Sequence, residues 1–113
     1  MISGIFSTSF KSGGGTDCGV AVFSGNTIHG GDASFYYRGK YTINDRNLIS
    51  GTIEFIRYSH LQYSVVGPMD EFTLLLNGQV IVNDKEFSLS APVEGHPELL
   101  ITIALKKLDE LIV

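Results

Sequence analysis

The segment from residue 34 to residue 43, SFYYRGKYTI, alternates between apolar and polar side chains, and this pattern constrains the fold more than any other feature. The odd-numbered positions form the apolar set, which comprises Phe35, Tyr37, Gly39, Tyr41 and Ile43. The intervening positions are polar, apart from Tyr36. Successive side chains of a β-strand point to opposite faces, so the pattern predicts a strand with one face on a core and the other in water.

Shorter segments along the chain repeat this alternation, and turn-forming residues separate them. The predicted strands include residues 6–10, 19–23, 49–55, 72–76, 80–82, 87–89 and 99–105. Asn, Asp and Gly tolerate the positive φ of tight hairpin turns, and they recur at residues 24–26, 43–47, 77–78 and 83–86. Asn77-Gly78, within LLLNGQVIV, is the strongest hairpin signal. Residues 91–97 are predicted as a loop before the last strand.

The number of strands and their short connections predict an all-β fold. Short connections make sequence neighbours antiparallel neighbours, and about eight such strands avoid open edges by closing into an up-and-down barrel. A β-sandwich is the alternative. The chain of 113 residues is predicted to be one barrel domain, residues 1–113. Leu105, Leu108 and Ile112 also fit one face of a helix, so the end of the chain is either strand or a short terminal helix.

Charge and composition exclude several classes of function. The net charge is −4, with 8 basic and 12 acidic residues, and the basic residues are scattered, so direct nucleic-acid binding is not expected. The sequence has no run of about 20 apolar residues, so no membrane span is expected. The first residues lack the basic and apolar regions of a signal peptide, which favours a cytoplasmic location. The single cysteine, Cys18, excludes an internal disulfide.

No motif points to catalysis or to a cofactor. Gly30-Gly31-Asp32 lacks the lysine and the following helix of a phosphate loop, and it is better interpreted as a glycine bulge or tight turn in which Asp32 caps nearby N–H groups. Valine at either glycine should then harm folding. The histidines, His29, His60 and His96, lack the spacing of metal ligands. Cys18 fits a small buried hydrophobic residue better than a nucleophile.

Two groups of residues are candidates for binding other molecules. Tyr36 and Arg38 share the polar parity of their strand, and this pair of residue types is common in protein interfaces. The segment 60–69 is too apolar for an ordinary exposed loop, so Leu61 and Tyr63 are predicted to cover a barrel mouth, an edge or a partner subunit. Tyr37 points inward, where it either lines a ligand pocket or, more in keeping with a small barrel, fills the core.

The order of these segments resembles the GrlR family of small bacterial regulators. The resemblance covers nearly the whole chain: GIFSTSF, then CGVAVFSGNTIHGGDASFYYRGKY, then SVVG before DEFTLLLNGQV, and LKKL near the end. Its most specific positions are Gly30, Gly31, Asp32, Tyr37 and Gly39, which look architectural in the family. The resemblance implies a lipocalin-like antiparallel barrel, a homodimer and an apolar interior that could admit a ligand.

The resemblance also implies a role in regulation. The founding member represses type III secretion genes indirectly, by binding a transcriptional activator, and an acidic surface cluster matters for that contact. In the comparable region of this chain Asp45 is the one acidic residue, and Arg46 opposes it. The first hypothesis is a non-enzymatic adaptor that binds a regulatory protein. The alternative is a carrier or sensor of a small apolar ligand, with an interior cavity lined by Phe6, Phe10, Tyr37 and Phe55.

Overall fold

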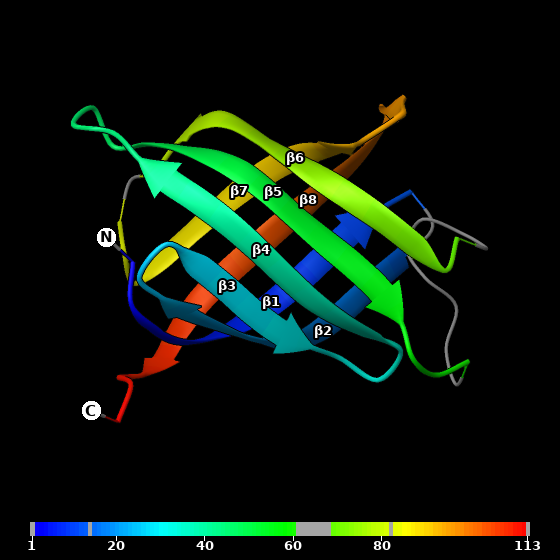
Figure 1. Cartoon of the computed structure of the whole chain (residues 1–113), viewed down its shortest axis with the longest axis horizontal. Coiled ribbons are helices and arrows are strands. Elements are labelled where there is room, and N and C mark those ends of the chain that lie inside the picture. Colours follow the sequence, from blue (N-terminus) through cyan, green and yellow to red (C-terminus); the bar gives the residue numbers. More distant parts are fainter. Residues whose placement is uncertain (1, 14, 61–68, 82, 113) are drawn as a thin grey trace.

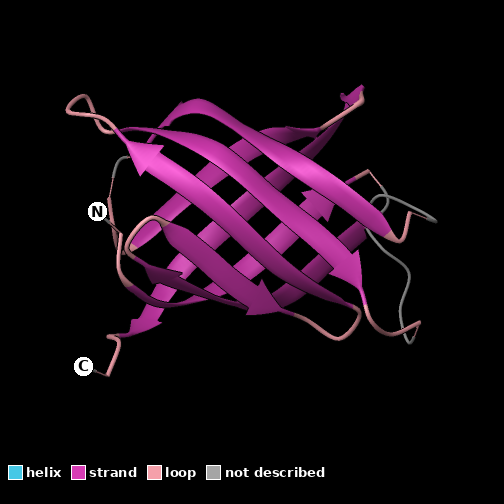
Figure 2. Cartoon of the chain, in the orientation of Figure 1, coloured by secondary structure: helices cyan, strands magenta, loops and turns pink. Residues whose placement is uncertain are grey.

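The computed structural model describes residues 2–13, 15–60, 69–81 and 83–112. Eight antiparallel strands form a closed barrel in which neighbours in the sequence are neighbours in space, and β8 returns to β1 (Figure 1). No helix occurs in the described part of the chain, and so none that is long and apolar enough to cross a membrane (Figure 2). The strands are β1 (Gly4–Ser12), β2 (Gly15–Ser24), β3 (Thr27–Gly31), β4 (Phe35–Ile43), β5 (Leu48–Arg57), β6 (Glu71–Val80), β7 (Glu86–Val93) and β8 (His96–Asp109). The all-β barrel predicted from the alternating pattern is therefore confirmed.

The barrel is flattened, with Cα extents of 37 × 30 × 19 Å. In Figure 1, β3 to β6 form the nearer layer, and β7, β8, β1 and β2 form the layer behind, with the strands of the two layers crossing. Flattening brings the two inner faces close together, so side chains from opposite walls can meet across the interior.

The inner faces form one apolar core that is rich in aromatic rings. Phe6 contacts Phe23 and Phe87 at ring-centroid distances of 5.0 and 6.0 Å, both edge to face. Towards one end of the barrel, the Tyr41 hydroxyl lies 2.9 Å from the carbonyl oxygen of Ile2 and is itself buried. Residues that alternate in the sequence thus fill the barrel from every wall.

The expected hairpin at Asn77-Gly78 is wrong. β6 continues through this dipeptide, with Ser50 paired to Asn77 and Ile49 paired to Gln79, so Gly78 is an extra residue in its strand. Its φ of 71° identifies a glycine bulge, which needs the same left-handed conformation as a hairpin turn. The Asn-Gly dipeptide indicates a residue in the left-handed conformation, and this indication does not distinguish a bulge from a hairpin turn.

The predictions for the last part of the chain also need correction. No terminal helix forms in the described residues up to 112, because β8 continues to Asp109 and pairs with both β1 and β7. The ladder with β7 extends to Lys106 and the ladder with β1 to Asp109, and these backbone hydrogen bonds override the helical spacing of Leu105 and Leu108. The loop predicted for residues 91–97 is limited to a turn at Glu94 and Gly95, and Pro92 lies within β7.

Candidate functional site

Gly30 and Gly31 lie inside β3 and not in a bulge or turn, which corrects that part of the sequence interpretation. They pair in regular register with β2 on one side and β4 on the other. A Cβ atom on Gly30 would overlap the Val20 carbonyl oxygen and lie 2.8 Å from the Cα of Ala21. Gly30 therefore permits the close approach of two backbones, which is the usual reason for a glycine within a strand.

Asp32 caps the turn between β3 and β4, as the sequence predicts. Its Oδ1 accepts hydrogen bonds from the backbone N–H groups of Ser34 and Phe35, at 2.9 and 2.8 Å. Its Oδ2 accepts a hydrogen bond of 3.3 Å from the Tyr37 hydroxyl. The Tyr58 hydroxyl donates to the Asp32 carbonyl oxygen. Asp32 thus connects the turn with Tyr37 in the core and with Tyr58, the residue that follows β5.

The Tyr37 hydroxyl is held in its protonated form. Burial raises the pKa of Tyr37 well above its usual value, and the negative charge of Asp32 raises it further. The Thr8 hydroxyl is buried close to this phenol. A phenol that keeps its proton serves as a donor to Asp32 and is poorly suited to act as a base.

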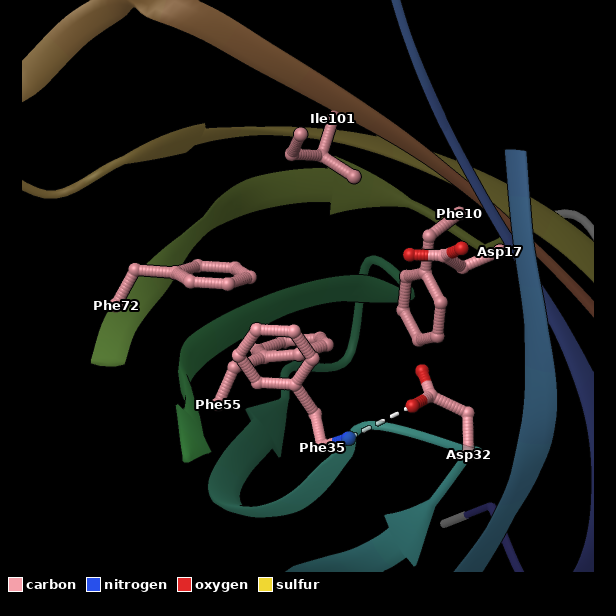
Figure 3. A pocket seen from close by; sticks show the side chains of 7 residues that line it. All are labelled: Phe10, Asp17, Asp32, Phe35, Phe55, Phe72 and Ile101. Carbon is pink, nitrogen blue, oxygen red and sulfur yellow. Dashed lines mark hydrogen bonds between the residues drawn. The ribbon is translucent and has the colours of Figure 1, made fainter. Parts of the chain in front are cut away.

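The barrel end next to Asp32 contains a small hollow with an aromatic floor and an acidic side. Figure 3 shows the rings of Phe10, Phe35 and Phe55 grouped together, with the carboxylates of Asp17 and Asp32 beside them. Phe10 meets Phe55 edge to face at 5.1 Å, and Arg57 lies over the Phe35 ring, 4.6 Å from its centroid. The remaining volume is about 10 Å³, space for about one water molecule.

The interior is filled rather than hollow. Phe6, Phe10, Tyr37 and Phe55, the residues expected to line a ligand cavity, are all buried among other core side chains. The cavity beside Phe10 and Tyr37 has a volume of about 20 Å³ and an apolar lining. Small-molecule sites usually measure about 300–1,000 Å³, so a ligand would require the core to rearrange.

The outer surface next to the Asp32 turn is apolar and aromatic. Val20, Gly31, Tyr36 and Ile56 follow one another as cross-strand neighbours over β2, β3, β4 and β5. Tyr58 adds a ring whose centroid lies 6.5 Å from that of Tyr36. We call these five residues the Tyr36 face. Three of its side chains are substantially exposed, at 44% for Val20, 45% for Tyr36 and 60% for Tyr58, and Ile56 is half-buried.

The other residues predicted for partner binding are distributed differently. Arg38 lies next to the Tyr36 face on β4 and pairs with Glu54 at 3.6 Å, with both side chains exposed. Asp45 and Arg46 occupy the exposed turn beyond Ile43, and Ile43 is already roughly 23 Å from Tyr36 along β4. Asp45 and Arg46 therefore cannot belong to the same compact contact surface as Tyr36. Leu61 and Tyr63 lie outside the described residues.

Sequence reasoning missed Tyr58, Ile56 and Arg57. The alternation of β5 places Ile56 and Tyr58 on the outer side of the strand, and this signal could have marked them as surface residues, although not as neighbours of Tyr36. Arg57 continues the inner parity of Phe55, and its side chain is 6% exposed and pairs with Asp70 at 2.8 Å. Asp70 itself is exposed, so only the Arg57 side of this ion pair is buried, and a charged residue at an inward position near a strand end was the available sign of it.

Cys18 is exposed, contrary to the expectation that it is buried. It lies on the outer parity of β2, opposite Ser9 of β1. Among the described residues, no group of three or more His, Cys, Asp or Glu side chains is arranged to hold a metal ion.

In comparisons with known proteins, no family model and no curated protein matches the chain.

Proposed function

We propose that this chain is a non-enzymatic adaptor that acts by binding another protein, with the Tyr36 face as its contact surface. The observation that supports this function most is the contrast between the inside and the outside of the barrel. The interior cavity of about 20 Å³ leaves no room for a ligand, whereas Tyr36 and Tyr58 expose large ring surfaces outside. Binding through the outer wall needs no rearrangement of the core.

The composition of the Tyr36 face supports this role. Tyrosine and arginine are over-represented among the residues that dominate binding energy, and Tyr36, Tyr58 and Arg38 lie together here. The face is built on strands, and the Tyr58 hydroxyl is tied to the Asp32 carbonyl. Its rings are therefore held in place before a partner arrives, which reduces the entropy lost on binding.

The resemblance to the GrlR family extends the proposal to the partner and to the assembly. By this analogy the partner is a regulatory protein of type III secretion, the effect is negative, and the chain is a homodimer. The position of Asp45 and Arg46 argues for a contact that differs from an acidic cluster, because the two charges oppose each other and lie far from Tyr36. A resemblance to a family supports the fold of this chain more strongly than it supports the identity of its partner.

The test compares complexes purified from the native host with three tagged baits: wild type, Tyr36→Ser and Thr42→Ser. Thr42 is the matched control, because it is exposed on the same face of β4 but near its other end. A protein retained by wild type and Thr42→Ser is then purified, and its Kd is measured by calorimetry. We expect Tyr36→Ser to weaken this Kd about 30-fold or more, as for a central interface residue.

Two results would overturn the proposal. One is a purified partner that binds wild type and Tyr36→Ser equally well. The other is a bare barrel that carries a small apolar molecule in native mass spectrometry, which would favour the carrier hypothesis and show that the interior expands.

A further inference from the structure

The contact between β6 and β7 differs from every other contact in the barrel wall. The two strands are sequence neighbours, but their ladder contains one described pair, Leu74 with Val93. By contrast, β6 pairs with β5, and β7 pairs with β8, along most of their lengths. In Figure 1, β6 lies in the nearer layer and β7 in the farther one, so the wall changes layers at this contact. We call it the β6–β7 seam.

A proline explains why the ladder stops. The Glu94 N–H donates to the Thr73 carbonyl oxygen at 2.8 Å, which places the backbone groups of residue 94 on the β6 side. Val93 is paired with Leu74, and in such an antiparallel pair the backbone groups of the residues on both sides of Val93 face the partner strand, so residue 92 also faces β6. Residue 92 is proline and has no N–H group. The next backbone donor towards β6 is therefore absent, as is typical of a strand edge.

A glycine bulge and a side-chain hydrogen bond also distinguish the seam from the other ladders. Gly78 inserts one residue into β6 where the strand would otherwise continue alongside β7, and bulges bend and twist the strand that carries them. Beyond the bulge, the side-chain amide of Gln79 donates to the Ser90 carbonyl oxygen at 2.8 Å. Here a side chain supplies a hydrogen bond that backbone N–H groups supply in the other ladders.

We propose that the barrel opens locally at the β6–β7 seam, at a lower free energy than at any other ladder. Separating two strands breaks the backbone hydrogen bonds between them, and among the described residues this seam has the fewest ladder pairs. Both strands contribute buried apolar side chains to the shared core, Leu76 from β6 and Leu89 from β7, and this burial holds the seam closed. Opening would uncover the aromatic core without disrupting the ladders that support the Tyr36 face.

Native-state hydrogen exchange in low concentrations of denaturant tests this inference on the wild-type protein. We expect amides of β6 and β7 near the seam to exchange through a local opening, at least about tenfold faster than amides of the β1–β8 and β4–β5 ladders. Gln79→Ala should speed this exchange further. The control is Asn77→Ala, on the same strand with an exposed side chain, which should leave the exchange unchanged.

Pro92→Val provides the opposite perturbation, because it restores a backbone N–H on the β6 side. We expect slower exchange of the seam amides and little change in the β1–β8 ladder. The inference is overturned if wild-type seam amides exchange only with global unfolding, or if another ladder opens first. The exchange rates of seam amides and of the other ladders in the wild-type protein test the inference even if Pro92→Val fails to fold.

Discussion

The two adjacent glycines of β3 should differ in their tolerance of alanine: Gly30→Ala should destabilise the protein, and Gly31→Ala should have little effect. Gly30 points into the crowded side of the strand, where an added Cβ would overlap the Val20 carbonyl and lie 3.0 Å from the Tyr37 ring. At Gly31 the nearest atom would be the Phe35 carbonyl oxygen at 3.2 Å, and the next 3.7 Å away. Neither glycine has a positive φ, so the difference is one of space alone.

The magnitude follows from these distances. Forcing a methyl group against backbone on Gly30 requires β2 and β3 to shift, and such overpacking usually costs about 1–3 kcal/mol. At Gly31 a small displacement of the Phe35 carbonyl is sufficient to accommodate the added methyl group. Alanine also restricts the unfolded chain, which stabilises a protein by about 0.4–1 kcal/mol where the folded conformation is compatible. We therefore expect Gly31→Ala to lie within about 1 kcal/mol of wild type.

Urea unfolding followed by far-UV circular dichroism measures the difference, since the chain has no tryptophan to report by fluorescence. With a denaturant slope of about 2 kcal/mol per molar, Gly30→Ala should lower the midpoint by roughly 0.5–1.5 M, and Gly31→Ala should leave it within about 0.5 M. Equal effects of the two substitutions, or a larger loss at Gly31, would refute the claim that close backbone approach determines the need for glycine here.

Three further predictions concern the Asp32 turn, Tyr37 and Cys18. Asp32→Ala removes the cap of two backbone N–H groups and should lower the free energy of unfolding by about 1–2 kcal/mol, measured by urea unfolding, with Asp45→Ala as an exposed control. The raised pKa of Tyr37 means that the unfolded chain loses its proton near pH 10 while the folded chain retains it, so stability should fall as pH rises above about 10. Tyr37→Phe should remove part of that fall, and an identical pH dependence would contradict the assignment. Cys18 should react stoichiometrically with a thiol reagent in the native protein, and Cys18→Ser should change stability by less than about 0.5 kcal/mol; slow labelling would mean that a second copy or a partner covers this surface.

The barrel could be predicted from the sequence because its determinants are local and repeated. Each strand carries its own alternation, and each hairpin needs residues that accept a particular backbone conformation. The turn at Gly25-Asn26, between β2 and β3, illustrates this, since Gly25 has a φ of 59°. Sequence order then determines most of the topology, because every connection except the one between β5 and β6 is short and leaves no choice of neighbour.

The failures arise where a distant partner decides between two local options. Asn77-Gly78 fits a hairpin or a bulge, and pairing with β5 selects the bulge. The segment after Leu105 fits a helix face or a strand, and pairing with β1 selects the strand. The Tyr36 face could not be assembled from sequence either, because Val20, Tyr36 and Ile56 become neighbours only through the registers of three ladders.

The Gly-Gly-Asp motif connects the inside of the barrel with the outer surface proposed to bind a partner. On the inner side, the Asp32 carboxylate accepts the hydrogen bond of Tyr37 and caps the start of β4. On the outer side, its carbonyl oxygen accepts the hydrogen bond of Tyr58, whose ring lies beside Tyr36. Gly31 contributes no side chain between Val20 and Tyr36, so both remain accessible. A motif that looks purely architectural therefore also sets the shape of the Tyr36 face, and damage to the turn should weaken partner binding even where the barrel still folds.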